Sequence, residues 1–211
     1  MKKLIAMLLT VLIVQTPLLA QNADRDIKGM VDYFERLQKE LARAETEDTR
    51  QKILKSARKR ALSMIDTELI ARLSLGNHYE RLTEDQQEEF IDSFNALFAH
   101  HIVETHIPTE KIVANPVKVT VLSRMKRYDP YFFQQAEVVK VSVTKGKAVY
   151  RASFYMVKHW SGYKIYDIHL DGASLLMDYR LQFQSIIQEK GFDYLLEKLR
   201  GRLQEFHDNG K

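Results

Sequence analysis

Apolar residues recur every three or four positions in the first and last thirds of the chain, which is the spacing of one face of an α-helix. Thr83 and Gln86 form a capping box, and three phenylalanines line the helix that it opens. Helices therefore come first and last in the chain. The pattern predicts them over residues 27–41, 66–79, 83–102, 174–189 and 192–206, with one more after residue 48.

In the middle of the chain the pattern changes to a two-residue alternation, which is typical of strands with one buried face. Gly146 and Gly162 fall between consecutive strands as turn residues, so the last three strands are expected to form an antiparallel meander. Residues 128–133, between the first two strands, predict a turn with an exposed aromatic cluster. We expect an α+β fold, with a four-stranded, mostly antiparallel sheet packed against N- and C-terminal helices. The predicted strands span residues 117–124, 136–144, 147–157 and 163–170.

The N-terminus has the features of a secretory signal peptide. Two lysines follow Met1 and precede an apolar run over residues 4–14, which is too short to span a bilayer comfortably. We expect residues 1–20 to be removed, with cleavage after Ala23 as the alternative, leaving a single domain over residues 24–208. An uncleaved anchor is less favoured. The chain has no cysteine, so neither a disulfide nor lipoprotein acylation is available, and we expect a soluble periplasmic protein.

Charge and composition exclude several classes of function. The net charge is only +4, and two of those charges belong to the leader, so no nucleic-acid partner is indicated. The sequence has no glycine-rich phosphate loop and no cysteine pair. His101 and His106 are five residues apart on a predicted helix, a spacing that cannot chelate one ion. We expect neither a metal nor a cofactor.

The helix predicted after residue 48 carries a run of basic residues. The favoured interpretation is a solvated face on a helix whose other side packs in the core. The alternative is a docking patch for anionic lipid headgroups or for an acidic partner. The basic residues are Arg50, Lys52, Lys55, Arg58, Lys59 and Arg60.

Asp167, His169 and Asp171 alternate along one face of the last strand. A carboxylate–histidine–carboxylate row can orient a base or hold a metal. No serine or cysteine nucleophile accompanies this row in the sequence, so a small α+β enzyme is the less favoured hypothesis. We expect Asp167 and Asp171 to tie the strand to the following helix, through backbone N–H groups or through Arg180.

Two ordered blocks of the chain stand out as motifs. The first is Trp160-Ser-Gly-Tyr-Lys-Ile-Tyr-Asp-Ile-His-Leu-Asp-Gly-Ala-Ser-Leu followed by Tyr179-Arg-Leu-Gln-Phe. The second is Leu75-Gly76 with Tyr79, Thr83-Glu84, Phe90, Phe94 and Leu97. Together they resemble the signature of the MlaC family, which belongs to the Mla (toluene-tolerance) transport system, and the similarity runs from about Ile65 to Leu199. Ile65-Asp66-Thr67 matches the family pattern only in part, and Ile102 stands where the family commonly has a tyrosine.

The resemblance implies a function in lipid transport. It suggests a periplasmic phospholipid carrier, not an enzyme, that shuttles lipid between an outer-membrane lipoprotein–porin complex and an inner-membrane ABC transporter with an MCE-domain subunit. Such a carrier helps to maintain the lipid asymmetry of the outer membrane. A carrier of another lipid, such as a hopanoid, is an alternative that the predicted lining does not separate from the first.

The resemblance also implies a deep cavity for acyl chains between the sheet and the helices. Alternation places the apolar residues of each strand on one face, and aromatic residues of two helices are expected to cover that face. Periodicity alone does not distinguish a packed core from a core with a slot. The residues expected to line the cavity are Phe94, Phe98, Val119, Val141, Ala148, Tyr150, Ala152, Phe154, Tyr166, Ile168, Leu176, Tyr179 and Phe183.

Overall fold

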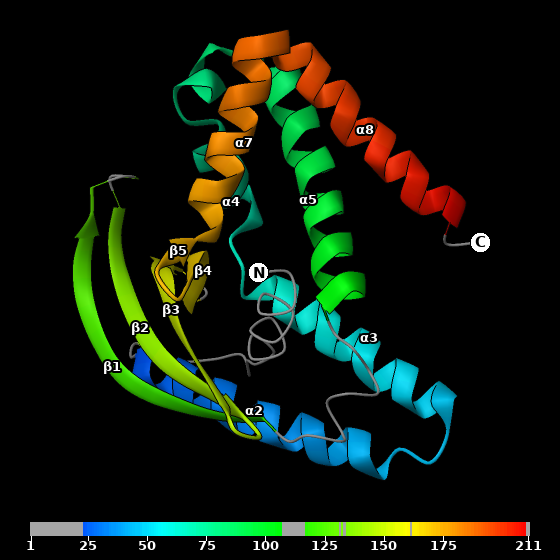
Figure 1. Ribbon diagram of the computed structural model, residues 1–211, viewed down its shortest axis with the longest axis vertical. Coiled ribbons are helices and arrows are strands. Elements are labelled where there is room, and N and C mark those ends of the chain that lie inside the picture. The colour runs from blue at the N-terminus through cyan, green and yellow to red at the C-terminus, as the bar shows by residue number, and fades with distance from the viewer. Residues whose placement is uncertain (1–22, 107–116, 131, 133, 161, 210–211) are drawn as a thin grey trace.

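The computed structural model describes residues 23–106, 117–130, 132, 134–160 and 162–209 (Figure 1). The expected signal peptide therefore lies outside the described residues. Within the part that is described, no helix is both long and apolar enough to cross a bilayer.

The helices expected from the apolar periodicity are present, and local side-chain contacts fix where several of them begin. Thr83 and Gln86 exchange backbone-to-side-chain hydrogen bonds of 3.1 and 3.3 Å, as the capping box predicts. Gly76, at a positive φ of 55°, ends one helix and opens a short 3-10 turn. The helices are α2 (Ala23–Arg43), α3 (Glu47–Ser63), α4 (Thr67–Leu75), α5 (Glu84–His106), α7 (Leu175–Lys190) and α8 (Phe192–Asn209), with the 3-10 helix η1 (Gly76–Arg81).

The strands form one antiparallel sheet in the order β1-β2-β3-β4-β5, which confirms the expected α+β class and the meander. The sheet has five strands rather than four. The extra strand is only two residues long and forms because a tight turn at Asp171 and Gly172, both at positive φ, folds the chain back onto β4. The strands are β1 (Val117–Asp129), β2 (Gln134–Lys145), β3 (Ala148–His159), β4 (Gly162–Leu170) and β5 (Ala173–Ser174).

Strand β1 is longer than its sequence pattern predicts. A bulge between Val121 and Ser123 shifts the register against β2, and pairing then continues to Asp129. Such a bulge inserts one residue into the strand and reverses the alternation beyond it. A strict two-residue pattern is therefore lost after residue 122, although the strand itself continues.

The sheet is strongly curved, and the helices lie on its concave side (Figure 1). In this view α4, α5 and α7 lie together above β4, and α2 and α3 cross the lower part of the molecule. The connector between α3 and α4 joins the sheet directly: Ile165 N–H donates to the Met64 carbonyl, and Asp66 N–H donates to the Ile165 carbonyl, both at 2.8 Å. The core therefore lies between the concave face and the helices.

The aromatic residues between β1 and β2 do not form the exposed cluster that was expected. Tyr128 is exposed, but Phe132 is buried, with its ring edge-on to Tyr166 at 6.4 Å and the guanidinium of Arg180 at 5.8 Å from its centre. Tyr131 and Phe133 lie outside the described residues. The expectation is therefore wrong for Phe132, because the turn folds back over the sheet and provides this side chain with a site against Tyr166.

Candidate functional site

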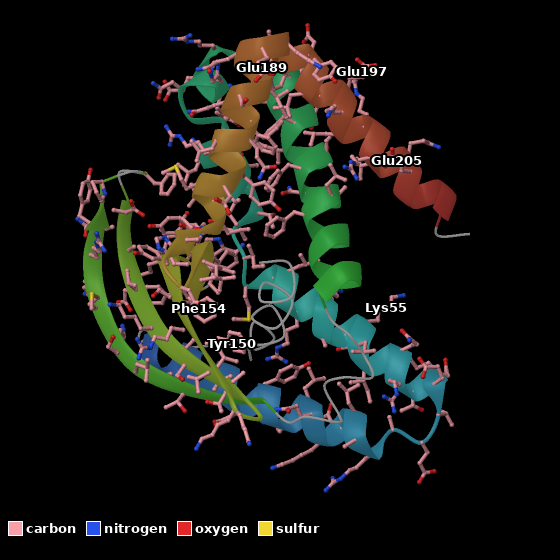
Figure 2. The ribbon with its side chains drawn as sticks, in the orientation of Figure 1. Lys55, Tyr150, Phe154, Glu189, Glu197 and Glu205 are labelled. Carbon is pink, nitrogen blue, oxygen red and sulfur yellow. The ribbon has the colours of Figure 1, made fainter. Side chains whose placement is uncertain are left out.

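The strand residues expected to line a cavity form rows across the concave face of the sheet. Residues directly opposite each other in neighbouring strands share a face. Phe154 and Tyr150 point from β3 toward the side where α3 and α5 lie (Figure 2). Ala148, at the start of β3, is on the same face by register but is exposed. The rows are Val119–Val143–Tyr150, Val141–Ala152–Leu170 and Val139–Phe154–Ile168.

Tyr166 departs from this face because of a second bulge. The register shifts between Tyr155 and Met156, so that Tyr166 has no partner on β3. Its hydroxyl donates to Oδ2 of Asp129 at 3.0 Å, and its ring lies edge-on to Tyr155. Burial, together with the charge and hydrogen bond of Asp129, raises the pKa of Tyr166 far above its usual range. Tyr166 thus packs beneath the β1–β2 turn rather than beside Ile168.

The helical residues expected at the site come together as an aromatic cluster between α5 and α7. Phe94 lies 5.5 Å from Phe98 and 5.4 Å from Tyr179, and Tyr179 lies 5.8 Å from Phe183, measured between ring centres. Phe90 extends the cluster toward α8 through an edge-on contact with Phe183 at 5.7 Å. Such pairs add about 0.5–1.5 kcal/mol beyond the area they bury. The cluster therefore holds the two helices together next to the concave face.

Tyr179 is the polar member of this cluster. Burial raises the pKa of its hydroxyl to about 12. No hydrogen bond from that hydroxyl is found within the part of the chain that the structure describes. A tyrosine in such a place normally gives its hydroxyl a partner. Tyr179 therefore leaves one hydrogen-bonding group available at an otherwise apolar site.

The start of α7 is fixed by the buried carboxylate of Asp167. Its Oδ1 accepts the backbone N–H of Ile168 at 2.7 Å and that of Leu176 at 3.0 Å. Its Oδ2 accepts the hydroxyl of Ser174 at 2.6 Å and contacts Nε2 of His169 at 2.9 Å. These contacts are the strand-to-helix tie that was expected for Asp167.

The other members of the acidic row do not join a catalytic arrangement. Asp171 is exposed, and its side chain accepts the N–H of Arg151 on β3 at 3.4 Å, so the expectation that Asp171 ties the strand to the following helix is wrong. Ser174 bonds to Asp167 and caps Met177, so it is not poised against His169. No group of three or more residues suited to hold a metal occurs in the described ranges. Within this row, Asp167 provides the connection between β4 and the start of α7.

Two hollows lie on the face of the sheet opposite to the concave one, and the sequence did not predict them. Their volumes are about 500 and 450 Å³, and they share Arg127, Tyr155, His169 and Gly172. The rings of Tyr155 and His169 stack at 4.2 Å between centres. Tyr155 is buried, and the smaller hollow is also lined by Val141 and Ala152 of the strand rows, so the alternation of polar and apolar positions did not indicate it. The larger hollow reaches the first turn of α7 at Met177 and Asp178; the smaller one includes Lys140 and Arg151.

The concave face ends in a buried polar group that the sequence also did not indicate. Nε of Arg124 donates to Glu137 at 2.6 Å, and the hydroxyl of Tyr163 donates to the same carboxylate at 2.8 Å. In the sequence Glu137 is followed by apolar residues, and its partner Arg124 lies thirteen residues earlier, too far away for a local pattern to connect the two. The group closes the apolar rows toward the β1–β2 turn.

The basic residues of α3 are mainly solvated. Lys52 pairs with Asp48 at 2.6 Å, and Lys55 is exposed on the outer side of the helix (Figure 2). Arg60 differs, because its guanidinium lies 4.6 Å from the ring centre of Tyr33, and its buried Nε and Nη2 have no hydrogen-bond partner among the described residues. The solvated-face interpretation therefore fits Lys52, Lys55 and Lys59, which are exposed, but not Arg60.

Comparison with known proteins agrees with this architecture. The family model described as MlaC protein matches residues 32–201. A solved structure of a phospholipid-binding protein from Ralstonia solanacearum, in complex with a phospholipid, superposes with a TM-score of 0.60 at 18% sequence identity, covering 84% of this chain and 98% of that one. No curated protein sequence matches the chain. Since the family model spans most of the sequence, the chain belongs to the MlaC protein family.

Proposed function

We propose that the protein is a periplasmic carrier of phospholipids, with the acyl chains held between the concave face of the sheet and helices α5 and α7. The observation that carries the proposal is the pairing of two apolar surfaces, the strand rows and the aromatic cluster, in a fold that also occurs in a phospholipid complex. Membership of the MlaC family supports the same assignment.

Carriage needs burial rather than chemistry. Each methylene removed from water contributes about 0.8 kcal/mol, so an acyl chain of ordinary length needs an apolar site to cross an aqueous compartment. The protein has to enclose the chains and leave the headgroup in water. No covalent step, metal or nucleotide is required of the carrier itself.

The strand rows provide uneven volume for such chains. Ala152 is a small residue between Val141 and Leu170 in its row, and Tyr150 and Phe154 flank it along β3. A small side chain among large ones leaves room without breaking the backbone pairing. We assign the lining to these rows, to the cluster of α5 and α7 and to Leu176. Ala148 belongs at the exposed edge and Tyr166 supports the sheet from the other side.

We assign the carrier a place between two membranes. Lipid passes between an outer-membrane lipoprotein–porin complex and an inner-membrane ABC transporter with an MCE-domain subunit, and this traffic maintains outer-membrane asymmetry. Release requires a partner that offers the acyl chains a better site, because the free energy gained by burying them opposes their return to water. Family membership is what supports these partners.

Mass spectrometry of lipid that co-purifies with the exported protein tests the proposal. The expected result is phospholipid in near-stoichiometric amount, in protein recovered from the periplasm without its leader. If a different lipid such as a hopanoid co-purified, the protein would still be a lipid carrier, but its ligand would not be a phospholipid. A protein that is empty after mild purification and that turns over a small substrate would contradict the carrier assignment. N-terminal sequencing of the same sample checks the leader, because retention in the membrane with Met1 intact would exclude free shuttling.

A further inference from the structure

Trp160 is the only tryptophan of the chain, and it is 99% exposed at the turn between β3 and β4. Tryptophan is usually largely buried, because its ring is one of the largest apolar surfaces a protein carries. A fully exposed ring contributes nothing to the core of this fold. The position therefore suggests contact with something outside the chain.

The turn is held firmly by the residues beside it. Nε2 of His159 lies 2.6 Å from Oδ2 of Asp66, and Asp66 in turn caps α4 by accepting the N–H of Leu69 at 3.1 Å. On the other strand, Ile165 exchanges backbone hydrogen bonds with the α3–α4 connector. Trp160 is thus presented on a hairpin end that two helices and the sheet fix in place.

A second exposed aromatic ring lies at the same end of the sheet. Because β1 to β4 are antiparallel neighbours, the β1–β2 and β3–β4 turns lie at one end, and the β2–β3 turn lies at the other. Tyr128, the second-last residue of β1, is 50% exposed. Trp160 and Tyr128 thus form part of one projecting edge, which we call the aromatic edge.

The charges of the aromatic edge are unbalanced. Lys126, Arg127 and Lys158 are exposed and have no ion-pair partner in the ranges that the structure describes. Three acids at this end have partners within the protein: Asp129 accepts from Tyr166, Glu137 accepts from Arg124 and Tyr163, and Asp66 pairs with His159. One acid near this end, Glu68 in the first turn of α4, is exposed, so the cations outnumber it. The aromatic edge therefore carries two exposed aromatic side chains close to three basic side chains that form no ion pair among the described residues.

We propose that the aromatic edge docks on the surface of an anionic lipid bilayer, with the Trp160 ring entering the headgroup region. Tryptophan and tyrosine are enriched at membrane–water interfaces, and basic residues near an anionic surface each add to binding. A partner protein fits less well, because a stable interface needs about 800 Å² on each side and this edge consists of two narrow turns. Docking is independent of the proposed carriage: it concerns where the protein meets a membrane, not what it holds.

The only tryptophan also serves as the probe. Fluorescence of the mature protein is recorded with vesicles of phosphatidylcholine containing phosphatidylglycerol, and with phosphatidylcholine alone. We expect the emission to move to shorter wavelength with the anionic vesicles and to be quenched when their acyl chains are brominated. High salt should reverse the shift, because exposed charges are screened.

Sedimentation with sucrose-loaded anionic vesicles then separates the ring from the charges. Trp160→Ser should weaken association about tenfold, the loss expected for roughly 60 Å² of apolar surface no longer buried. Lys158→Glu should weaken it at least about fivefold. Val149→Ser and Lys147→Glu are matched controls, because both residues are exposed at the opposite end of the same sheet, and they should bind as the wild type does.

The two ideas fail separately. An unchanged emission spectrum with anionic vesicles, or equal losses in the controls at residues 147 and 149, would overturn the docking proposal whatever the lipid content. A shift seen only after adding a purified protein complex, and not with vesicles, would overturn it in favour of a protein partner. Lipid content of Trp160→Ser is expected to equal that of the wild type. If neither protein holds lipid, the carrier proposal fails and docking is judged on the vesicle data alone.

Discussion

Asp167 of β4 accepts the backbone N–H of Leu176 at 3.0 Å, across the turn that separates the sheet from helix α7. The same carboxylate accepts the N–H of Ile168 and the hydroxyl of Ser174. One buried side chain thus fixes the direction in which α7 leaves the sheet. Because Tyr179 lies one turn further along that helix, Asp167 also positions the aromatic cluster over the concave face.

Replacing Asp167 by alanine should lower the free energy of unfolding by about 3 kcal/mol. The substitution leaves two buried backbone N–H groups and a hydroxyl without their acceptor, and each unsatisfied group costs about 1–3 kcal/mol. Urea unfolding of delipidated protein measures the change. Asp171→Asn is the matched control: the residue is exposed, and asparagine tolerates its positive φ of 48°, so stability should change by less than about 0.5 kcal/mol. Equal losses in both variants would contradict the role assigned to Asp167.

Removing the hydroxyl of Tyr166 should destabilise the sheet without affecting lipid. Tyr166→Phe deletes the donor to Asp129 and leaves a buried carboxylate oxygen with one hydrogen bond fewer, at a cost of about 1.5–3 kcal/mol. Thermal and urea unfolding check the loss, and lipid content should stay at the wild-type level because the ring lies away from the concave rows. Tyr128→Phe, at an exposed tyrosine, should leave stability unchanged.

Stability should depend on pH in the alkaline range through Tyr179. Burial raises the pKa of its hydroxyl to about 12, against about 10 in an unfolded chain. Below pH 10 the tyrosine is protonated in both states and contributes no pH dependence. Between about pH 10 and 12 the unfolded chain loses this proton first, so the free energy of unfolding falls as pH rises.

Tyr179→Phe tests this dependence. The variant lacks the ionisable group, so its free energy of unfolding should fall less steeply between about pH 10 and 12 than that of the wild type. Urea titrations at several pH values in that range give both slopes. Identical slopes would mean that the hydroxyl is solvated in the folded protein, and Tyr179 would then not be the desolvated polar group of the site.

Much of the fold was predicted from patterns of residues that lie close together in the sequence. The capping residues Thr83 and Ser174 each act within one helical turn, and the glycine turns each act within one hairpin, so the sequence predicts these elements directly. The caps and the glycine turns need no knowledge of the tertiary structure. The strand-to-helix tie was expected for both Asp167 and Asp171, but only Asp167 makes it among the described residues. Asp167 lies nine residues before Leu176 and reaches it because the turn at Asp171 and Gly172 folds the chain back onto β4.

What the sequence did not indicate depends on the two bulges and on long-range pairing. The bulge in β1 interrupts the alternation after residue 122, so the strand was predicted to end at residue 124 and not at Asp129. The bulge opposite Met156 turns Tyr166 away from Ile168. Phe132 is buried only because the turn that carries it folds onto Tyr166. A bulge changes which face a residue occupies without leaving a signal in composition. Site predictions built on strict alternation are therefore weakest next to bulges.

His169→Ala distinguishes a structural row from a catalytic one. The imidazole contacts Oδ2 of Asp167 at 2.9 Å and stacks on Tyr155 at the edge of a hollow on the far side of the sheet. Lipid transfer between donor and acceptor vesicles should stay within about twofold of the wild type, because the side chain does not face the concave rows. Loss of transfer in a variant that keeps its fold would revive the enzyme hypothesis.

Enlarging Ala152 tests whether the concave rows enclose lipid. Ala152 lies between Val141 and Leu170 across the sheet. If the space above it holds acyl chains, Ala152→Trp fills that space with an indole ring, and bound lipid should disappear while the melting temperature of delipidated protein hardly falls. In a solid core the same change forces overpacking, which typically costs about 1–3 kcal/mol.

Ala71→Trp provides the matched comparison for this prediction. Ala71 is fully buried in α4, outside the proposed lining, so the larger side chain should destabilise the delipidated protein by overpacking and leave the lipid of the folded fraction in place. Melting temperature and lipid content are measured on both variants after identical delipidation and reloading. The proposed cavity predicts opposite outcomes: lipid lost at position 152 and stability lost at position 71. Strong destabilisation by Ala152→Trp with lipid still bound would show that the acyl chains lie elsewhere, because a filled slot and a retained ligand exclude each other at the same place.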